Sequence, residues 1–261
     1  MRQKYALVCT PADTVASALR MQHLGEVSVP RLKRQHDQYL HALQSFGYTL
    51  ITLPPDPSLP DSTFVEDPTI NIDNQMLVVA RLENAKRRGE EERMLGLIKP
   101  LFEEMPIARI VYPGMIEGGD VLVADGKLYI GISKRTNTEG AVQLERIAHK
   151  LGWSAETIPV PSTYLHLKGE ATYHPEWNCL TVSEEIAGHF EGSGLRMIVT
   201  PKEERFAGNC ISHGNQILIH KGSIVTAKLL RKEGFEPIAL DLSEFAKIDG
   251  AMTCLSKFFS P

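Results

Sequence analysis

Cysteine and histidine are the residue types in this sequence best suited to nucleophilic catalysis. A thiolate is a strong nucleophile, and a histidine moves protons near neutral pH. Cys254 lies in the glycine-containing loop that starts at Lys247, and His166 lies between two leucines. The other cysteines, Cys9, Cys179 and Cys210, are typical of small core residues. A histidine between two leucines is more often a buried structural residue, so the choice of Cys254 and His166 as candidates rests on their place in the repeat described below.

Acidic residues gather in two loops, 60–68 and 116–120. The first contains Asp61, Glu66 and Asp67, and the second contains Glu117. Carboxylates complement a planar guanidinium cation through paired, charge-assisted hydrogen bonds, although Glu66 and Asp67 could also serve only as a turn before a proline. No HExxH or CxxC spacing occurs, so we predict a site without a metal ion or another cofactor.

Composition excludes several classes of protein. The chain has 261 residues, 28 basic and 32 acidic side chains, a net charge of −4 and 43% hydrophobic residues. It offers no basic footprint for nucleic acid or an anionic membrane, and its apolar runs are too short for a membrane span or signal peptide. Widely spaced cysteines suit a reducing compartment. We expect a cytoplasmic globular protein that binds neither nucleic acid nor membrane.

The elements that must position these residues recur along the chain. Four predicted hairpins each place two β-prone runs around turn residues. Helices are predicted at about Pro30–Phe46, Glu90–Glu104 with a kink at Pro100, from a capping box at Thr136–Glu139 to Gly152, and at Ile224–Glu233. A strand predicted to be buried follows each helix, and a fifth such strand completes the unit that starts with the third hairpin. The hairpins span 69–79, 121–131, 171–182 and 210–220, and the later strands Tyr48–Leu53, Ala108–Tyr112, Ala155–Val160, Leu195–Thr200 and Pro237–Leu242.

The repeating unit is thus hairpin, helix and strand, about fifty residues long. Five units fill the chain if the fifth hairpin is split between Ala251–Phe258 and Tyr5–Cys9, so that the two ends pair. We predict one α/β domain, residues 1–261, that forms a five-bladed propeller of ββαβ repeats with pseudo-fivefold symmetry. A doubly wound α/β sheet is the alternative, which the hairpins fit poorly.

The loops that enter the hairpins share one phase of this repeat. They carry Asp61, Glu66 and Asp67, then Glu117 and Asp120, then His166, Asn209 and Cys254. Loops of equal phase should converge at one end of the central axis. Acids, one histidine and one thiol in that position make an active site.

At these residues the sequence resembles the guanidino-group-modifying, or pentein, enzymes, and specifically the short bacterial type of the dimethylarginine dimethylaminohydrolase family. The resemblance runs nearly end to end and rests on ordered motifs. They include Thr10-Pro11, Leu53-Pro-Pro-Asp56, Phe64-Val-Glu-Asp-Pro68, Arg87-Arg-Gly-Glu90, Arg135-Thr-Asn137, Leu165-His-Leu-Lys168, Asn209-Cys-Ile211 and Lys247-Ile-Asp-Gly250. One departure is Gly169-Glu170, where relatives tend to have Thr or Ser before Gly.

The resemblance implies hydrolysis of methylated arginines to citrulline and methylamine or dimethylamine. Cys254 would attack the guanidinium carbon, and His166, oriented by Glu117, would protonate the leaving amine and later activate water. Cys254 would stay largely neutral until the cationic substrate arrives, which is our hypothesis for its ionisation. The implied substrate contacts are Glu66 and Asp67 at the guanidinium, Arg87 and Arg135 at the α-carboxylate, and Asp61, Leu19 and Ile248 at the α-amino end. The family also admits a homodimer.

Two other readings stay open. An arginine deiminase would share the Cys/His chemistry and hydrolyse another guanidine. Arginine deiminases, however, are longer chains, and they usually have Thr-Arg-Asp where this sequence has Val65-Glu-Asp67. A non-catalytic binding module of the same fold would lack the Cys254/His166 pair. The sequence favours the methylarginine hydrolase over both.

Overall fold

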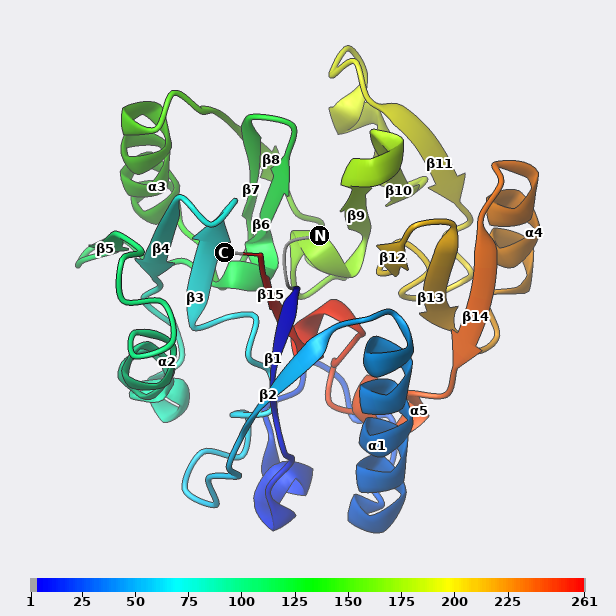
Figure 1. Ribbon diagram of the computed structural model, residues 1–261, viewed down its shortest axis with the longest axis horizontal. Coiled ribbons are helices and arrows are strands. Elements are labelled where there is room, and N and C mark those ends of the chain that lie inside the picture. The colour runs from blue at the N-terminus through cyan, green and yellow to red at the C-terminus, as the bar shows by residue number, and fades with distance from the viewer. Residues whose placement is uncertain (1–3, 261) are drawn as a thin grey trace.

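The strands form five separate three-stranded sheets set around a common centre (Figure 1). The computed structural model describes residues 4–260. In every sheet the first two strands are antiparallel, and the third lies parallel to the second. This confirms the predicted five-bladed α/β propeller over the doubly wound alternative. The blades are β15 (Lys257–Phe259), β1 (Tyr5–Cys9) and β2 (Thr49–Leu53); β3 (Thr69–Ile72), β4 (Met76–Val79) and β5 (Ile107–Arg109); β6 (Val121–Ala124), β7 (Lys127–Ile132) and β8 (Ser154–Pro159); β9 (Ala171–His174), β10 (Cys179–Ser183) and β11 (Arg196–Thr200); β12 (Ile211–His213), β13 (Gln216–His220) and β14 (Glu236–Leu240).

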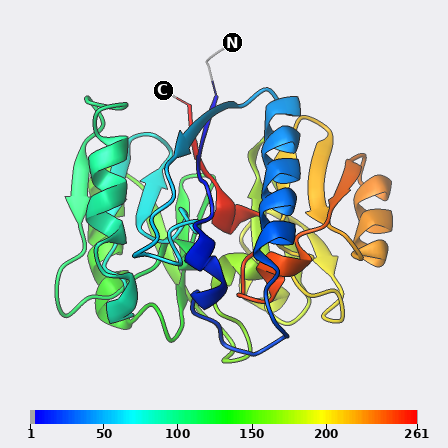
Figure 2. The ribbon, with the colours of Figure 1, turned by 90° about the horizontal axis from the view of Figure 1, so that it is seen from below.

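The longer helices lie on the outer side of the ring, as Figures 1 and 2 show. The blade of β9–β11 has a 3₁₀ turn, η6, where the repeat predicts an α-helix. The helices are α1 (Val29–Ser45), α2 (Glu90–Ile98), α3 (Thr138–Lys150), α4 (Ile224–Lys232) and α5 (Ser243–Ala246), and the 3₁₀ turns are η1 (Asp13–Ser17), η2 (Ala85–Arg87), η3 (Gly118–Asp120), η4 (Leu167–Gly169), η5 (Pro175–Trp177), η6 (Ala187–Phe190) and η7 (Thr253–Leu255).

Helix α1 follows the predicted pattern closely. Pro30 lies in its first turn, where a missing N–H costs nothing. Leu32, Tyr39 and Leu43 are fully buried on one face at helical spacing. Beyond the helix, Gly47 adopts φ +79°, a left-handed conformation that favours glycine. The predicted helix is confirmed within one residue at each end.

Two helix boundaries differ from the prediction. Helix α2 ends at Ile98, and the chain then turns instead of continuing through a kink at Pro100, which has no N–H to donate. Helix α3 is capped by Asn137, whose side chain accepts from the Gly140 N–H, and not by Thr136. The Thr136 hydroxyl instead accepts from the Glu117 N–H at 3.2 Å.

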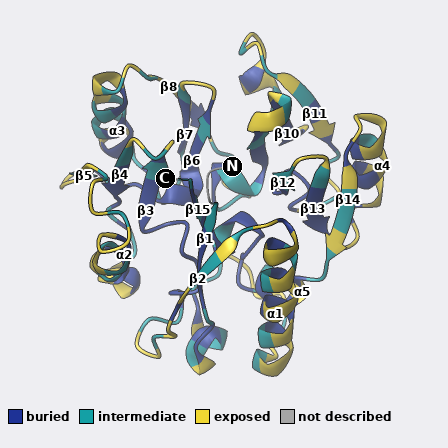
Figure 3. Cartoon of the chain, in the orientation of Figure 1, coloured by how far each residue is buried: buried dark blue, intermediate teal, exposed yellow. Residues whose placement is uncertain are grey.

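The third strand of each blade is less buried than predicted. Within β2 only Leu53 is buried, and within β8 only Ile158. Strands β5 and β14 contain no fully buried residue. These strands form the outer edge of their sheets, so much of each one faces solvent, whereas the second strands are the middle strands and are mostly buried (Figure 3). Alternating apolar residues indicated the strands correctly but not their position in the sheet.

The two ends of the chain complete one blade together. Strand β1 pairs with β15, with Tyr5 opposite Phe259 and Leu7 opposite Lys257. The predicted split hairpin is confirmed, but its C-terminal strand starts at Lys257, not Ala251, because residues 253–255 form the turn η7. Among residues 4–260, no helix combines the length and the apolar character that a bilayer crossing requires.

Candidate active site

The predicted site residues meet beside Cys254, where two cavities share a wall. The narrow pocket, of about 20 Å³, is lined by every predicted site residue except Glu66 and Glu117. The wide pocket, of about 240 Å³, is lined by Glu66 and also by His166 and Cys254. The predicted convergence of equal-phase loops is therefore observed. The lining of the narrow pocket is Leu19, Asp61, Phe64, Asp67, Arg87, Arg135, Leu165, His166, Ile248, Asp249 and Cys254.

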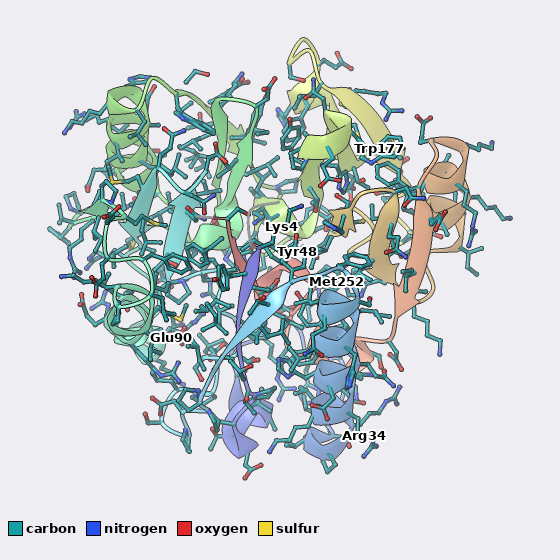
Figure 4. All side chains as sticks on the ribbon, viewed as in Figure 1. Lys4, Arg34, Tyr48, Glu90, Trp177 and Met252 are labelled. Atoms are coloured by element: carbon teal, nitrogen blue, oxygen red, sulfur yellow. The ribbon has the colours of Figure 1, made fainter. Side chains whose placement is uncertain are left out.

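Cys254 lies in η7 at the end of a loop that crosses the centre of the molecule. Helix α1 anchors this loop, since the Tyr39 hydroxyl donates to the Met252 carbonyl at 2.9 Å and contacts the Ser256 hydroxyl at 2.6 Å. Met252 is labelled near the centre of Figure 4. The Cys254 side chain is partly exposed. Desolvation, with the charges of Glu66 and Asp67, holds the thiol pKa well above its usual range.

His166 precedes η4 and is surrounded by acids. Its Nε2 lies 2.8 Å from Glu117 Oε2, and its Nδ1 lies 3.9 Å from Asp67 Oδ1. Desolvation alone would lower the His166 pKa, but the charges of Asp67 and Asp120 and the contact with Glu117 outweigh it and raise the pKa to about 9. The imidazole is therefore protonated at neutral pH and ready to donate a proton.

Two adjacent glycines allow these groups to approach. A Cβ on Gly119 would lie 2.6 Å from His166 Nδ1 and 2.8 Å from Asp67 Oδ1, and one on Gly118 would lie 2.1 Å from the Glu66 carbonyl oxygen. A side chain at Gly118 would clash with backbone, and one at Gly119 would displace the His166 and Asp67 side chains. The Gly-Gly pair that opens η3 thus brings three loops into contact.

Asp67 and Arg87 belong to a buried ion network. Arg87 donates to Asp67 at 2.8 Å and to Glu90 at 2.8 Å, and it lies 3.7 Å from Glu117. Desolvation raises the Asp67 pKa, but His166 and Arg87 more than reverse this effect and lower it. The acids therefore already engage much of the Arg87 guanidinium. Arg135 is somewhat more accessible, and it donates to Glu117 at 3.0 Å.

The amino-acid end of the narrow pocket is formed around an entrance segment after η1. Both Asp61 oxygens accept from the Leu19 N–H, at 3.1 and 3.3 Å. The Met21 N–H donates to Asp249 at 2.5 Å. Ile248, the residue before Asp249, is buried and also lines the narrow pocket. Asp249 was not among the predicted site residues, although the Asp-Gly pair at 249–250 is a turn signature and Asp249 has φ +56°.

Glu66 faces away from the narrow pocket. One carboxylate oxygen accepts from Lys168, and the other accepts from the Thr253 hydroxyl at 3.0 Å. The ion pair between Glu66 and Lys168 separates the wide pocket from a third cavity of about 440 Å³, because the two residues line both cavities. The predicted contact of Glu66 with a guanidinium stays a prediction.

Two further residues hold the catalytic loops and had no assigned role. Asp120 accepts from the Leu167 N–H at 3.0 Å, which fixes the backbone beside His166. Asn209 donates to the Lys168 carbonyl at 2.7 Å and to the Thr253 hydroxyl at 2.9 Å, so it joins η4 to η7. Both lie in loops that the repeat placed at the right phase, which was the one available signal.

Asp67, Glu117 and His166 each place a ligand atom within 4.8 Å of the others. The same carboxylates already face the cations Arg87 and Arg135. These positive charges neutralise the acids where a metal ion would need them, so we assign no metal to this cluster.

Together these contacts suit nucleophilic attack on a cationic carbon. A thiol and a protonated imidazole share the junction of the two pockets. Asp67 lies beside His166 with one carboxylate oxygen paired to Arg87, and Asp61 and Arg135 line the same narrow pocket. The side-chain types complement a molecule with a guanidinium at one end and an amino-acid group at the other.

Comparisons with known proteins agree with this arrangement. The profile of a family described as "N,N dimethylarginine dimethylhydrolase, eukaryotic" matches residues 17–217. The N(G),N(G)-dimethylarginine dimethylaminohydrolase of Pseudomonas aeruginosa is 34% identical over 98% of this chain and 99% of that protein, and its Streptomyces coelicolor counterpart is 31% identical over 98% and 97%.

Solved structures show the same likeness. A Cys-to-Ser mutant of the P. aeruginosa enzyme complexed with citrulline superposes with a TM-score of 0.92, 32% identity and coverage of 99% of this chain and 100% of that one. The N-terminal domain of ArgZ, a cyanobacterial arginine dihydrolase, shares the fold at a TM-score of 0.84 and 19% identity. The chain belongs to the dimethylarginine dimethylaminohydrolase family.

Proposed function

We propose that this protein hydrolyses Nω-methylated arginines, both asymmetric dimethylarginine and monomethylarginine, to citrulline and dimethylamine or methylamine. The observation that carries the proposal is the junction where Cys254 and the protonated His166 meet, between carboxylates suited to a cation. Whole-length similarity to enzymes named for this activity supports it.

The first half of the reaction displaces the amine. The pKa of the unliganded Cys254 thiol is raised by its desolvation and by Glu66 and Asp67, so a bound guanidinium cation favours its loss of a proton. The sulfur then forms a bond to the guanidinium carbon, and the bond from that carbon to the methylated nitrogen breaks. His166 gives its proton to the leaving amine, which leaves a positively charged thiouronium on Cys254.

The second half returns the enzyme to its starting state. Neutral His166 takes a proton from water as the water oxygen bonds to the thiouronium carbon. The carbon–sulfur bond then breaks and Cys254 leaves as a thiolate. Citrulline forms as its extra proton passes to the Cys254 thiolate, which restores the neutral thiol. Glu117 holds His166 in position through both halves and stabilises its charge.

Substrate orientation is proposed to come from the narrow pocket. Asp67, with Glu66 behind it, would orient the guanidinium, and Arg135 with Arg87 would bind the α-carboxylate. Asp61 and the backbones of Leu19 and Ile248 would contact the α-amino group. Rigid orientation matters because a delocalised guanidinium is a weak electrophile.

Other expectations stay proposals as well. We propose that residues 1–261 act as a single domain, in the cytoplasm and without a cofactor. A homodimer is proposed from the family alone.

Citrulline release from asymmetric dimethylarginine, monomethylarginine and arginine tests the function. We expect turnover of both methylated substrates, poor turnover of arginine, and a loss of about a thousandfold or more in Cys254→Ser. Far-ultraviolet circular dichroism of Cys254→Ser serves as the folding control. Turnover of arginine alone would favour the deiminase alternative. No citrulline from any of the three would contradict the proposal and favour a binding module.

A further inference from the structure

The wide pocket adjoins the reaction centre, and its lining includes neither Asp61 nor Arg135, which line the narrow pocket. The two pockets share Leu165, His166, Asp249 and Cys254. An arginine side chain is linear. If its amino-acid group lies beside Asp61, the Nω substituent beyond the attacked carbon extends into the wide pocket.

The wide pocket is larger than a methyl substituent needs. Its volume of about 240 Å³ compares with about 20 Å³ for the narrow pocket. On the same measure, roughly 10–15 Å³ holds one water molecule. A substituent several atoms long therefore has room beside Cys254.

The charged side chains that line the wide pocket are mostly paired. Lys168 donates to Glu66, and Arg205 donates to Asp249 at 2.9 Å. Glu170 differs, because among residues 4–260 it makes no ion pair within 4.0 Å. Its side chain is nevertheless buried, with 5% of the residue exposed. Desolvation raises the pKa of its carboxyl group to about 7, against the smaller opposing effects of Ser183 and Arg205.

The backbone holds Glu170 firmly against this pocket. Its N–H donates to the Leu167 carbonyl at 3.0 Å, and its carbonyl accepts from the Ser183 N–H at 2.8 Å. Gly208 packs so closely that a Cβ there would lie 2.2 Å from the Glu170 carbonyl oxygen. The Glu170 backbone is thus fixed, and its carboxyl group lines the wide pocket four residues after His166.

A positively charged ligand group is disfavoured beside Glu170. His166 and Lys202 line the same pocket, whereas the charges of Lys168 and Arg205 are paired with Glu66 and Asp249. An anionic group would in turn meet the Glu170 carboxylate at close range. A neutral hydrogen-bond donor satisfies the acceptor without opposing either set of charges.

We propose that Glu170 determines specificity for the Nω substituent, and that this enzyme cleaves arginines whose Nω substituent carries a hydroxyl group, such as Nω-hydroxyalkyl arginines. The inference rests on the proposed function. The bond from the guanidinium carbon to the substituted nitrogen breaks as described above, water supplies the new oxygen, and the products are citrulline and a hydroxyalkylamine. Glu170 accepts a hydrogen bond from the hydroxyl and positions the leaving group.

Two substrates with the same number of heavy atoms test the proposal. Nω-(2-hydroxyethyl)-L-arginine and Nω-propyl-L-arginine differ only in a hydroxyl in place of a methyl. We expect kcat/KM for the hydroxyethyl substrate to exceed that for the propyl substrate by about tenfold or more. In Glu170→Met this ratio should fall to about one or below. The ratio is taken within each variant, so a general loss of activity cancels.

The controls separate Glu170 from general polarity and from folding. Lys202→Met removes an exposed charge that lines the same pocket, and it should keep the wild-type ratio. Glu170→Gln retains a carbonyl acceptor in nearly the same shape, so it should keep a preference for the hydroxyl and serves if Glu170→Met does not fold. Nω-(2-aminoethyl)- and Nω-carboxymethyl-L-arginine should both be poorer than the hydroxyethyl substrate.

Each outcome bears on one claim. Equal rates for the hydroxyethyl and propyl substrates in the wild type, or a ratio unchanged in Glu170→Met, would overturn the inference. Preference for the aminoethyl or carboxymethyl substrate would also overturn it. Turnover of monomethylarginine in those same assays would leave the proposed function standing, whereas no citrulline from any substrate would count against the proposed function itself.

Discussion

Neighbouring carboxylates control the charge of the His166 side chain. Desolvation disfavours the imidazolium, yet Asp67, Asp120 and Glu117 together raise the His166 pKa to about 9. Proton binding to His166 is therefore stronger in the folded protein than in the unfolded chain, where a pKa of about 6.5 is usual. That difference links catalysis to stability.

The His166 contribution to stability should depend on pH. Because the folded-state pKa is raised, the contribution is fully present below pH 6.5 and is lost as pH rises through about 9. We expect the free energy of urea unfolding to fall by about 1–3 kcal/mol over that window. His166→Asn should remove most of this fall, and His189→Asn, which changes an exposed histidine, should preserve it. A decrease of equal size in His166→Asn would contradict the assignment.

Arg87 and Arg135 should respond differently to the same substitution. Arg87 is buried and faces Asp67, Glu90 and Glu117. Arg87→Gln leaves these acids without their shared cation, so we expect a loss of about 3–5 kcal/mol in unfolding free energy. Arg135 is less buried and contacts only Glu117 among these acids.

Arg135→Gln should therefore cost less stability than Arg87→Gln and should raise KM for methylarginine, the expected result for a ligand of the α-carboxylate. Urea unfolding and steady-state kinetics on both variants make the comparison. Equal stability losses would show that the ion network is not centred on Arg87.

At the scale of elements, η3 determines how closely the catalytic loops approach. In Gly119→Ala, the new Cβ would collide with His166 Nδ1 and Asp67 Oδ1, which are side-chain atoms that can move. We expect the variant to fold, with kcat lowered by roughly 10²–10⁴, the usual contribution of a positioned general acid and base. Circular dichroism and citrulline release measure the two effects.

Gly188→Ala is the matched control for this substitution. A Cβ on Gly188 meets no atom within 4 Å, so activity and stability should stay near wild type. Wild-type activity in Gly119→Ala would show that His166 tolerates displacement, against the geometry described here.

Local sequence signals predicted most elements, because turn residues and apolar spacing act over a few residues. The hairpin β6–β7 around Asp125-Gly126 and the helix α1 are examples. Contacts between distant segments were beyond such signals. Asp249 binds the Met21 N–H, and Asn209 joins Lys168 to Thr253. Such pairings depend on how the blades close, and no local propensity encodes them.

The catalytic pair itself was predicted through the repeat and the family resemblance, since neither Cys254 nor His166 stands out by composition. The orientation of the Glu66 side chain away from the narrow pocket could not be predicted, because it depends on a contact with Lys168, which belongs to a distant part of the sequence. The low burial of the third strands depends likewise on their place at the edge of each blade.

On the scale of the whole molecule, the ring is held closed by a pairing between its two ends. Strands β1 and β15 lie side by side in one sheet, as both views show (Figures 1 and 2). Phe259 stacks on Phe102 of the neighbouring blade, with ring centroids 4.5 Å apart, and Lys257 donates to the Glu66 carbonyl at 2.9 Å. Closure of the ring thus supports the active-site loops directly.

If folding requires the closed ring but does not require the chain ends to lie in this blade, moving the ends elsewhere should have little effect on folding or activity. We expect a circular permutant, with a flexible linker between the original ends and new ends in the exposed turn 192–194, to fold and to retain citrulline release within about tenfold. Deletion of 257–261 removes β15, Lys257 and Phe259, and should abolish cooperative unfolding. Thermal melts and citrulline assays on both variants test this. A permutant opened inside the buried strand β13 is the negative control, and a deletion variant that unfolds like wild type would show that four blades suffice to hold the site together.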